Sequence, residues 1–135
     1  MRILDITAEK AFEIIEKASK KAKEINVPMV IAVVDSAGHL KAFKRMDDAI
    51  LASIDIAANK AFTAAACKAK TEDLSELANP GGELFGINTT NNGRIVTFGG
   101  GIPLAKDGEI IGAIGVSGGS VEEDVTVAKA GVEAL

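Results

Sequence analysis

Residues 94–120 read RIVTFGGGIPLAKDGEIIGAIGVSGGS, and this stretch decides how the chain folds. It contains eight glycines. The apolar runs between them predict three short strands, at 95–98, 102–105 and 109–116. Asp107-Gly108 predicts a tight hairpin between the last two strands. Because glycine lets another backbone or a ligand come close, the stretch builds either tightly packed surfaces or a pocket.

Two further strands are predicted before this stretch. Residues 29–34 form an unbroken apolar run, which is typical of a strand buried on both faces. A turn sequence follows at Asp35-Ser-Ala-Gly38, and residues 39–46 read as the hairpin partner. We expect the two most apolar strands, 29–34 and 109–116, to lie in the middle of the sheet.

Helices complete the predicted order. Thr7 is an N-cap candidate for the first helix, and Ser120 with Glu123 forms a capping box for the last one. The predicted helices cover residues 8–25, 48–68, 71–78 and 121–134. The order α-β-β-α-α-β-β-β-α contains two hairpins and no βαβ repeat. It predicts an α/β fold of the α+β type, with an antiparallel sheet of five strands flanked by helices in one domain, 1–135.

Composition limits the partners of the chain. A net charge of −4 and a pI of about 5.0 argue against sequence-independent nucleic-acid binding, which needs clustered lysines and arginines. No apolar run reaches the length of a membrane span. Cys67 is the single cysteine, which fits a reducing compartment. We therefore expect a cytoplasmic protein without a nucleic-acid or membrane partner.

The predicted helix at 48–68 is apolar on nearly every side and rich in alanine. Such a helix must be covered on every side. Hydrophobic residues make up 47% of the chain, which is high for a small soluble domain. We therefore expect a homo-oligomer in which a second subunit covers this helix.

His39 is the single histidine, so one subunit cannot form a multi-histidine zinc site. The imidazole remains a candidate haem ligand or general base, although a lone histidine after a turn is more often a surface residue. Cys67 is interpreted as a small buried hydrophobe rather than as a reactive thiol, and Met46 as a core residue rather than as a ligand. Glu122, Glu123 and Asp124 complement a helix dipole and argue against a phosphate site at the preceding glycines.

Arg45 and Asp47 form the other cluster of interest, together with Asp48. A cation beside two acids at a junction between a strand and a helix either pairs internally or binds a substrate carboxylate. Internal pairing and helix capping are the commoner outcome, and both interpretations stay open at this point.

Three segments together resemble the GlcG/HbpS-like family, which includes the C-terminal domain of PduO-type proteins (DUF336). They are VDSAGHLKAFKRMD at 34–47, GGGIPL at 99–104, and GAIGVSGG at 112–119 followed by Glu123-Asp124. The resemblance implies a profilin-like, five-stranded antiparallel sheet and an oligomer. Several members of the family bind haem, and others accompany glycolate, propanediol or cobalamin metabolism.

The resemblance also implies a binding site. His39 matches a position that is commonly histidine after the turn glycine, and it is the first candidate for an axial ligand of haem. Arg45 is expected to face a haem propionate. The remaining predicted ligand-binding residues are Asp47, Gly99, Gly100, Gly101, Pro103 and Ser117.

We therefore expect a cytoplasmic, oligomeric small-molecule binder, with haem as the cofactor, rather than an enzyme. One alternative is an enzyme or accessory protein that acts on a small hydroxy acid, an aldehyde or a corrinoid, with Arg45 holding a carboxylate and His39 or Asp47 moving a proton. A second alternative is a structural oligomer without a ligand.

Overall fold

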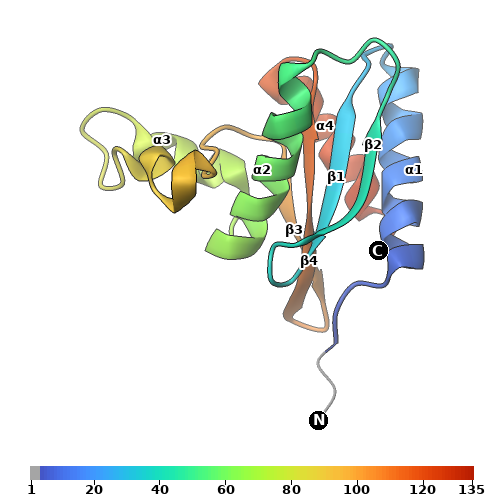
Figure 1. Ribbon diagram of the computed structural model, residues 1–135, viewed down its shortest axis with the longest axis horizontal. Coiled ribbons are helices and arrows are strands. Elements are labelled where there is room, and N and C mark those ends of the chain that lie inside the picture. The colour runs from blue at the N-terminus through green and yellow to red at the C-terminus, as the bar shows by residue number, and fades with distance from the viewer. Residues whose placement is uncertain (1–3) are drawn as a thin grey trace.

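The computed structural model describes residues 4–135 as a four-stranded antiparallel sheet covered by helices (Figure 1). The main elements are α1 (Ala8–Glu24), β1 (Val30–Asp35), β2 (Leu40–Arg45), α2 (Ala52–Cys67), α3 (Ser75–Ala78), β3 (Gly101–Lys106), β4 (Glu109–Ser117) and α4 (Val121–Val132). The predicted mixed α+β class is confirmed.

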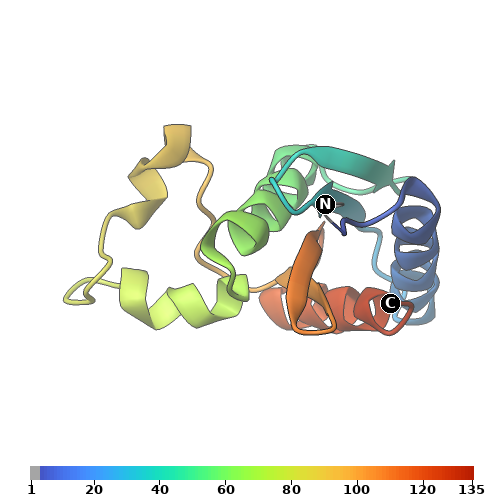
Figure 2. The same cartoon turned by 90° about the horizontal axis from the view of Figure 1, so that it is seen from below.

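The strand order is β2-β1-β4-β3, so the two strands predicted to be central are central. Every residue of β1 except Asp35 is buried, as the unbroken apolar run predicts. Helix α2 packs on one face of the sheet, while α1 and α4 lie on the other (Figures 1 and 2). A strand in the middle of such an arrangement has no solvated face.

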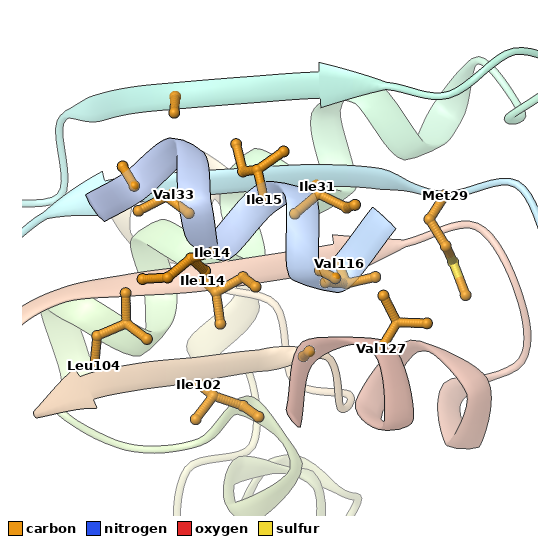
Figure 3. Close-up of a cluster of buried hydrophobic side chains, with 14 of the residues drawn as sticks. Ile14, Ile15, Met29, Ile31, Val33, Ile102, Leu104, Ile114, Val116 and Val127 are labelled. Atoms are coloured by element: carbon orange, nitrogen blue, oxygen red, sulfur yellow. The ribbon is translucent and has the colours of Figure 1, made fainter. Parts of the chain in front are cut away.

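The larger core cluster lies between the sheet and the pair α1 and α4 (Figure 3). Ile14 of α1, Val127 of α4 and Ile114 of β4 meet there with exposed fractions of 0%. The second cluster, beneath α2, consists largely of alanine, including Ala61 and Ala113. These small side chains bring the helix axis close to the sheet.

Gly115 of β4 shows how close that approach is. A Cβ atom at this position would overlap the backbone carbonyl oxygen of Ala57 and lie 2.5 Å from the backbone nitrogen of Ala61, both on α2. Helix α2 therefore rests directly on the strand, and only glycine fits between them.

The ends of the helices follow the predicted caps. Thr7 Oγ1 accepts a hydrogen bond of 3.1 Å from the backbone N–H of Lys10. Ser120 Oγ accepts from the Glu123 N–H at 3.2 Å, and Glu123 Oε1 accepts from the Ser120 N–H at 2.9 Å. This reciprocal pair confirms the predicted capping box and begins α4.

The prediction of a fifth strand at 95–98 is wrong. The structure shows four strands among the described residues, and residues 95–98 are irregular. The N–H of Val96 donates to Thr63 Oγ1 on α2 at 3.0 Å rather than to a neighbouring strand. A side-chain acceptor on the helix thus takes the place of a sheet ladder.

Two predicted helices also differ from the structure by more than two residues or in kind. Helix α2 begins at Ala52 rather than at residue 48, because Asp48 adopts a left-handed backbone with φ 69° that a helix cannot include. The predicted helix at 71–78 is a 3₁₀ turn, Thr71–Leu74, followed by the short helix α3.

Residues 75–93 form an arm that projects away from the sheet and its helices (Figures 1 and 2). Two further 3₁₀ turns, Ile87–Thr89 and Asn91–Gly93, lie within it. Phe85 in this arm is 67% exposed, and Leu51 at the start of α2 is 77% exposed. That a second subunit covers these side chains stays a prediction.

Candidate functional site

The structure separates the predicted site residues between the two ends of the sheet. Val30 of β1 pairs with Arg45 on one side and with Ser117 on the other, which places all three at one end. His39 precedes β2 at the opposite end. Arg45 is six positions after His39, and at about 3.3 Å a position along a strand the two Cα atoms lie roughly 20 Å apart.

His39 lies on the turn between β1 and β2 with 81% of its side chain exposed. Its backbone N–H donates to Asp35 Oδ1 at 2.9 Å, which fixes the turn. Its Nδ1 lies 3.8 Å from Asp35 Oδ2, on the same side. Within residues 4–135, no hydrogen bond involves Nε2, so that nitrogen faces solvent and is available to a metal.

The three glycines 99–101 are buried and face protein atoms. A Cβ on Gly99 would lie 2.6 Å from Val125 Cγ2, one on Gly100 would lie 2.7 Å from Lys60 Nζ, and one on Gly101 would lie 2.6 Å from Thr71 Cγ2. Of the two roles that the glycine-rich stretch allows, tight packing therefore applies here. Contact of these glycines with a ligand stays a prediction.

Ser117 and Pro103 also lie within the sheet. The Ser117 hydroxyl is hydrogen-bonded to Ser53 Oγ at 2.9 Å, and the residue is 5% exposed. Pro103 sits on the edge strand β3 opposite Ala113. Both residues shape the sheet, and their predicted ligand contacts remain untested.

Arg45 and Asp47 line a cavity of about 410 Å³ between the end of α1 and the end of β2. Lys23, Asn26 and Lys44 contribute polar groups to the same cavity. Ala22, Val27, Pro28 and Met46 form its apolar wall. The volume is in the range that proteins use for small molecules.

A buried ion pair was missed by the interpretation of the sequence. Lys60 of α2 is 0% exposed, and its Nζ donates to Asp124 Oδ2 and to the Val116 carbonyl oxygen, both at 2.9 Å. The ring centroid of Phe98 lies 4.9 Å from the same ammonium. The ammonium therefore has two hydrogen-bond acceptors and an aromatic ring beside it.

Asp124 is held equally firmly. Its Oδ1 accepts from the Gly119 N–H at 2.9 Å, while Oδ2 binds Lys60. Burial raises the pKa of Asp124, and the Gly119 hydrogen bond and the Lys60 charge oppose that shift. Burial likewise lowers the pKa of Lys60, and Asp124 opposes that shift. The pair joins α2, β4 and α4 at the end of the sheet that carries Ser117.

Two other kinds of site, a reactive thiol and a metal centre, find little support among the described residues. Burial raises the pKa of the Cys67 thiol, which disfavours a reactive thiolate. Across residues 4–135, no group of three or more His, Cys, Asp or Glu side chains is arranged to hold a metal ion. In the same range, no helix is long and apolar enough to cross a membrane.

The sequence matches the family described as "Haem degrading protein HbpS-like" over residues 6–133. The chain belongs to the HbpS-like family. The resemblance stated from the three motif segments is therefore confirmed.

Two crystal structures are similar to this HbpS-like chain over nearly its whole length. Klebsiella pneumoniae protein ORFY, a DUF336 protein, has 40% identity and a TM-score of 0.97, covering 99% of this chain and 92% of that one. A PduOC:heme complex has 38% identity and a TM-score of 0.94, covering 98% of this chain and 96% of that one.

Two curated relatives carry the other names associated with the family. GlcG of Escherichia coli K12 is 36% identical over 112 residues, which are 83% of this chain and 81% of GlcG. The corrinoid adenosyltransferase PduO of Salmonella typhimurium is 42% identical over 118 residues, which are 87% of this chain and 35% of PduO. This HbpS-like chain thus spans about a third of PduO.

Proposed function

We propose that this chain binds haem. The observation that carries the proposal is its match to the PduOC:heme complex, at 38% identity and with coverage of nearly both whole chains. The HbpS-like family description, which names haem, supports it. The proposal concerns binding, which any action on haem also requires.

The donor set at the turn between β1 and β2 fits an iron ligand. His39 offers an exposed Nε2, and Asp35 lies beside its Nδ1. At 3.8 Å the Asp35 carboxylate is beyond hydrogen-bond distance of Nδ1, and a rotation of the exposed ring would let it accept the Nδ1 proton while Nε2 binds a metal. When bound, haem would supply an iron centre that can take a nitrogen ligand from the protein. We therefore assign His39 as the axial ligand.

A side chain as exposed as His39 cannot enclose haem by itself. Leu40, the next residue, is 59% exposed and offers an apolar contact on the same turn. We propose that a second copy of the chain provides the opposite wall in a homo-oligomer. Exposed apolar residues elsewhere, such as Ile50 at 59% and Leu51, support association between copies.

The distance between His39 and Arg45 restricts how one haem could use both. An interval of roughly 20 Å along β2 exceeds the span between the iron of a porphyrin and its own propionates. A haem bound at His39 would therefore reach Arg45 of the same chain only with both side chains extended along the strand, and Arg45 of a second subunit is the other route to a propionate contact. We further propose a cytoplasmic location, which the single Cys67 supports.

A hemin titration of His39→Ala tests the assignment of the ligand. The variant is expected to weaken hemin binding at least about tenfold and to shift the Soret band away from that of the wild-type complex, because the iron loses its axial nitrogen. Lys41→Ala, at an exposed cation two residues further along the same edge, is the matched control. Equal affinity and identical spectra for His39→Ala and the wild type contradict His39 as the ligand.

The relatives also support a second candidate function. PduO is named as a corrinoid adenosyltransferase, and this chain matches a part of it. A parallel titration with cobalamin separates the two functions. Saturable binding of cobalamin without any binding of hemin favours the role in corrinoid metabolism.

A further inference from the structure

The cavity beside Arg45 has a composition that the haem proposal does not explain. Three cations line it: Lys23 from the last turn of α1, and Lys44 and Arg45 from β2. Lys44 Nζ is paired with Glu16 Oε1 at 3.1 Å. Within the described part of the chain, neither Lys23 nor Arg45 forms a salt bridge.

The local backbone holds these cations around the cavity. Asn26, two residues after the end of α1, has a left-handed backbone with φ 61°, which turns the chain so that Val27 and Pro28 form one wall. The N–H of Met46 donates to the Met29 carbonyl oxygen at 3.0 Å, which fixes the residues after β2 against the start of β1. The cavity is thus built by two segments that are tied together.

The wall opposite the charges is apolar. Ala22 is 0% exposed, and Val27 and Met46 pack against the main core cluster. Lys23 and Arg45, which form no salt bridge within the described residues, leave the lining with a net positive charge even when Asp47, its carboxylate, is counted. The apolar wall behind them suits an anion with a short hydrocarbon body. The neighbouring groove between α1 and α4 is also lined by lysines, together with Glu24 and Glu133, but among the described residues it has no apolar wall beyond Ala130.

We propose that this cavity binds a carboxylate carried on a short apolar chain. The Arg45 guanidinium matches the two oxygens of a carboxylate in a forked pair of hydrogen bonds. Lys23 adds the second positive charge, and Val27, Pro28 and Met46 contact the hydrocarbon. Two sources have this chemistry: a free short-chain acid, and the propionate of a bound haem.

A butyrate titration followed by amide NMR tests the proposal on the full chain without haem. Saturable shifts are expected at the amides of Lys23, Val27 and Met46. Arg45→Ala is expected to weaken butyrate binding at least about tenfold, as loss of a charge-assisted hydrogen-bond pair implies. Lys41→Ala, an exposed cation outside the cavity, is expected to leave the affinity unchanged, and Arg45→Lys to give an intermediate value.

Two results overturn the carboxylate site. In the first, butyrate causes no saturable amide shifts around the cavity, and Arg45→Ala also leaves the hemin affinity unchanged. The other is inorganic phosphate binding as tightly as butyrate, since the apolar wall then contributes nothing. The spectra of the variants also report whether each one is folded.

The hemin titration of Arg45→Ala distinguishes the two sources. If Arg45→Ala binds hemin more weakly and the wild-type chain does not bind free butyrate, the propionate is the occupant. Saturable butyrate binding with unchanged hemin affinity identifies a free acid. Butyrate binding by a chain that does not bind hemin leaves this site standing and removes the proposed haem function.

Discussion

Replacement of Lys60 by alanine is expected to lower the free energy of unfolding by about 3–5 kcal/mol. The substitution leaves the Asp124 carboxylate, whose side chain is 4% exposed, without its cationic partner. It also removes the donor to the Val116 carbonyl oxygen and opens a cavity under Phe98. Urea denaturation followed by circular dichroism measures the change.

A matched pair of variants separates the charge from the volume. Lys60→Met keeps much of the side-chain volume but still strands the carboxylate. Adding Asp124→Asn to Lys60→Met is expected to recover part of the lost stability, because the neutral amide leaves no buried charge and its oxygen can still accept from the Gly119 N–H. A double variant that is less stable than Lys60→Met contradicts this account.

Gly115→Ala is expected to lower the free energy of unfolding by about 3 kcal/mol, at the upper end of the usual range for overpacking. The added Cβ would meet the backbone of Ala57 and Ala61, and backbone atoms cannot rotate away as a side chain can. The helix α2 must then move off β4. Thermal and urea unfolding measure the loss.

Gly93→Ala is the control for this prediction. Gly93 has φ 74° and no atom within 4 Å of the position of its missing Cβ, so the variant meets only the left-handed backbone penalty of about 1–2 kcal/mol. If Gly115→Ala loses no more stability than Gly93→Ala, the close contact between α2 and β4 does not limit the fold.

The central strands and the helix caps were predictable because they depend on local pattern. The apolar run at 29–34 and the Ser120 capping box each specify one structure almost independently of the rest of the chain. The false strand at 95–98 has the same apolar pattern, but its N–H at Val96 bonds to Thr63 of a helix far away in sequence. Such a tertiary acceptor leaves no local signal.

The candidate site was harder to predict for a related reason. His39 and Arg45 are near in sequence, but an extended strand places them at opposite ends of the sheet. Lys60 was overlooked because a lysine in a helix is usually exposed. One signal was present: Lys60 is the single charged residue between Ile56 and Cys67, in a segment rich in alanine.

The buried Lys60–Asp124 pair also explains why two positions of the glycine-rich stretch are glycine. Gly100 passes over the Lys60 side chain, and Gly119 donates to the carboxylate that neutralises it. The glycines at these two positions therefore accommodate an internal ion pair at the end of the sheet that also carries Arg45. The two ligand contacts that we propose are made by exposed side chains, His39 at one end of the sheet and Arg45 at the other.

A hemin titration of the wild-type protein, followed by absorbance, tests the central claim most directly. Haem binding predicts a Soret band that differs from that of free hemin and saturates at a fixed ratio of haem to chain. A spectrum identical to that of free hemin at every ratio would contradict the proposed function.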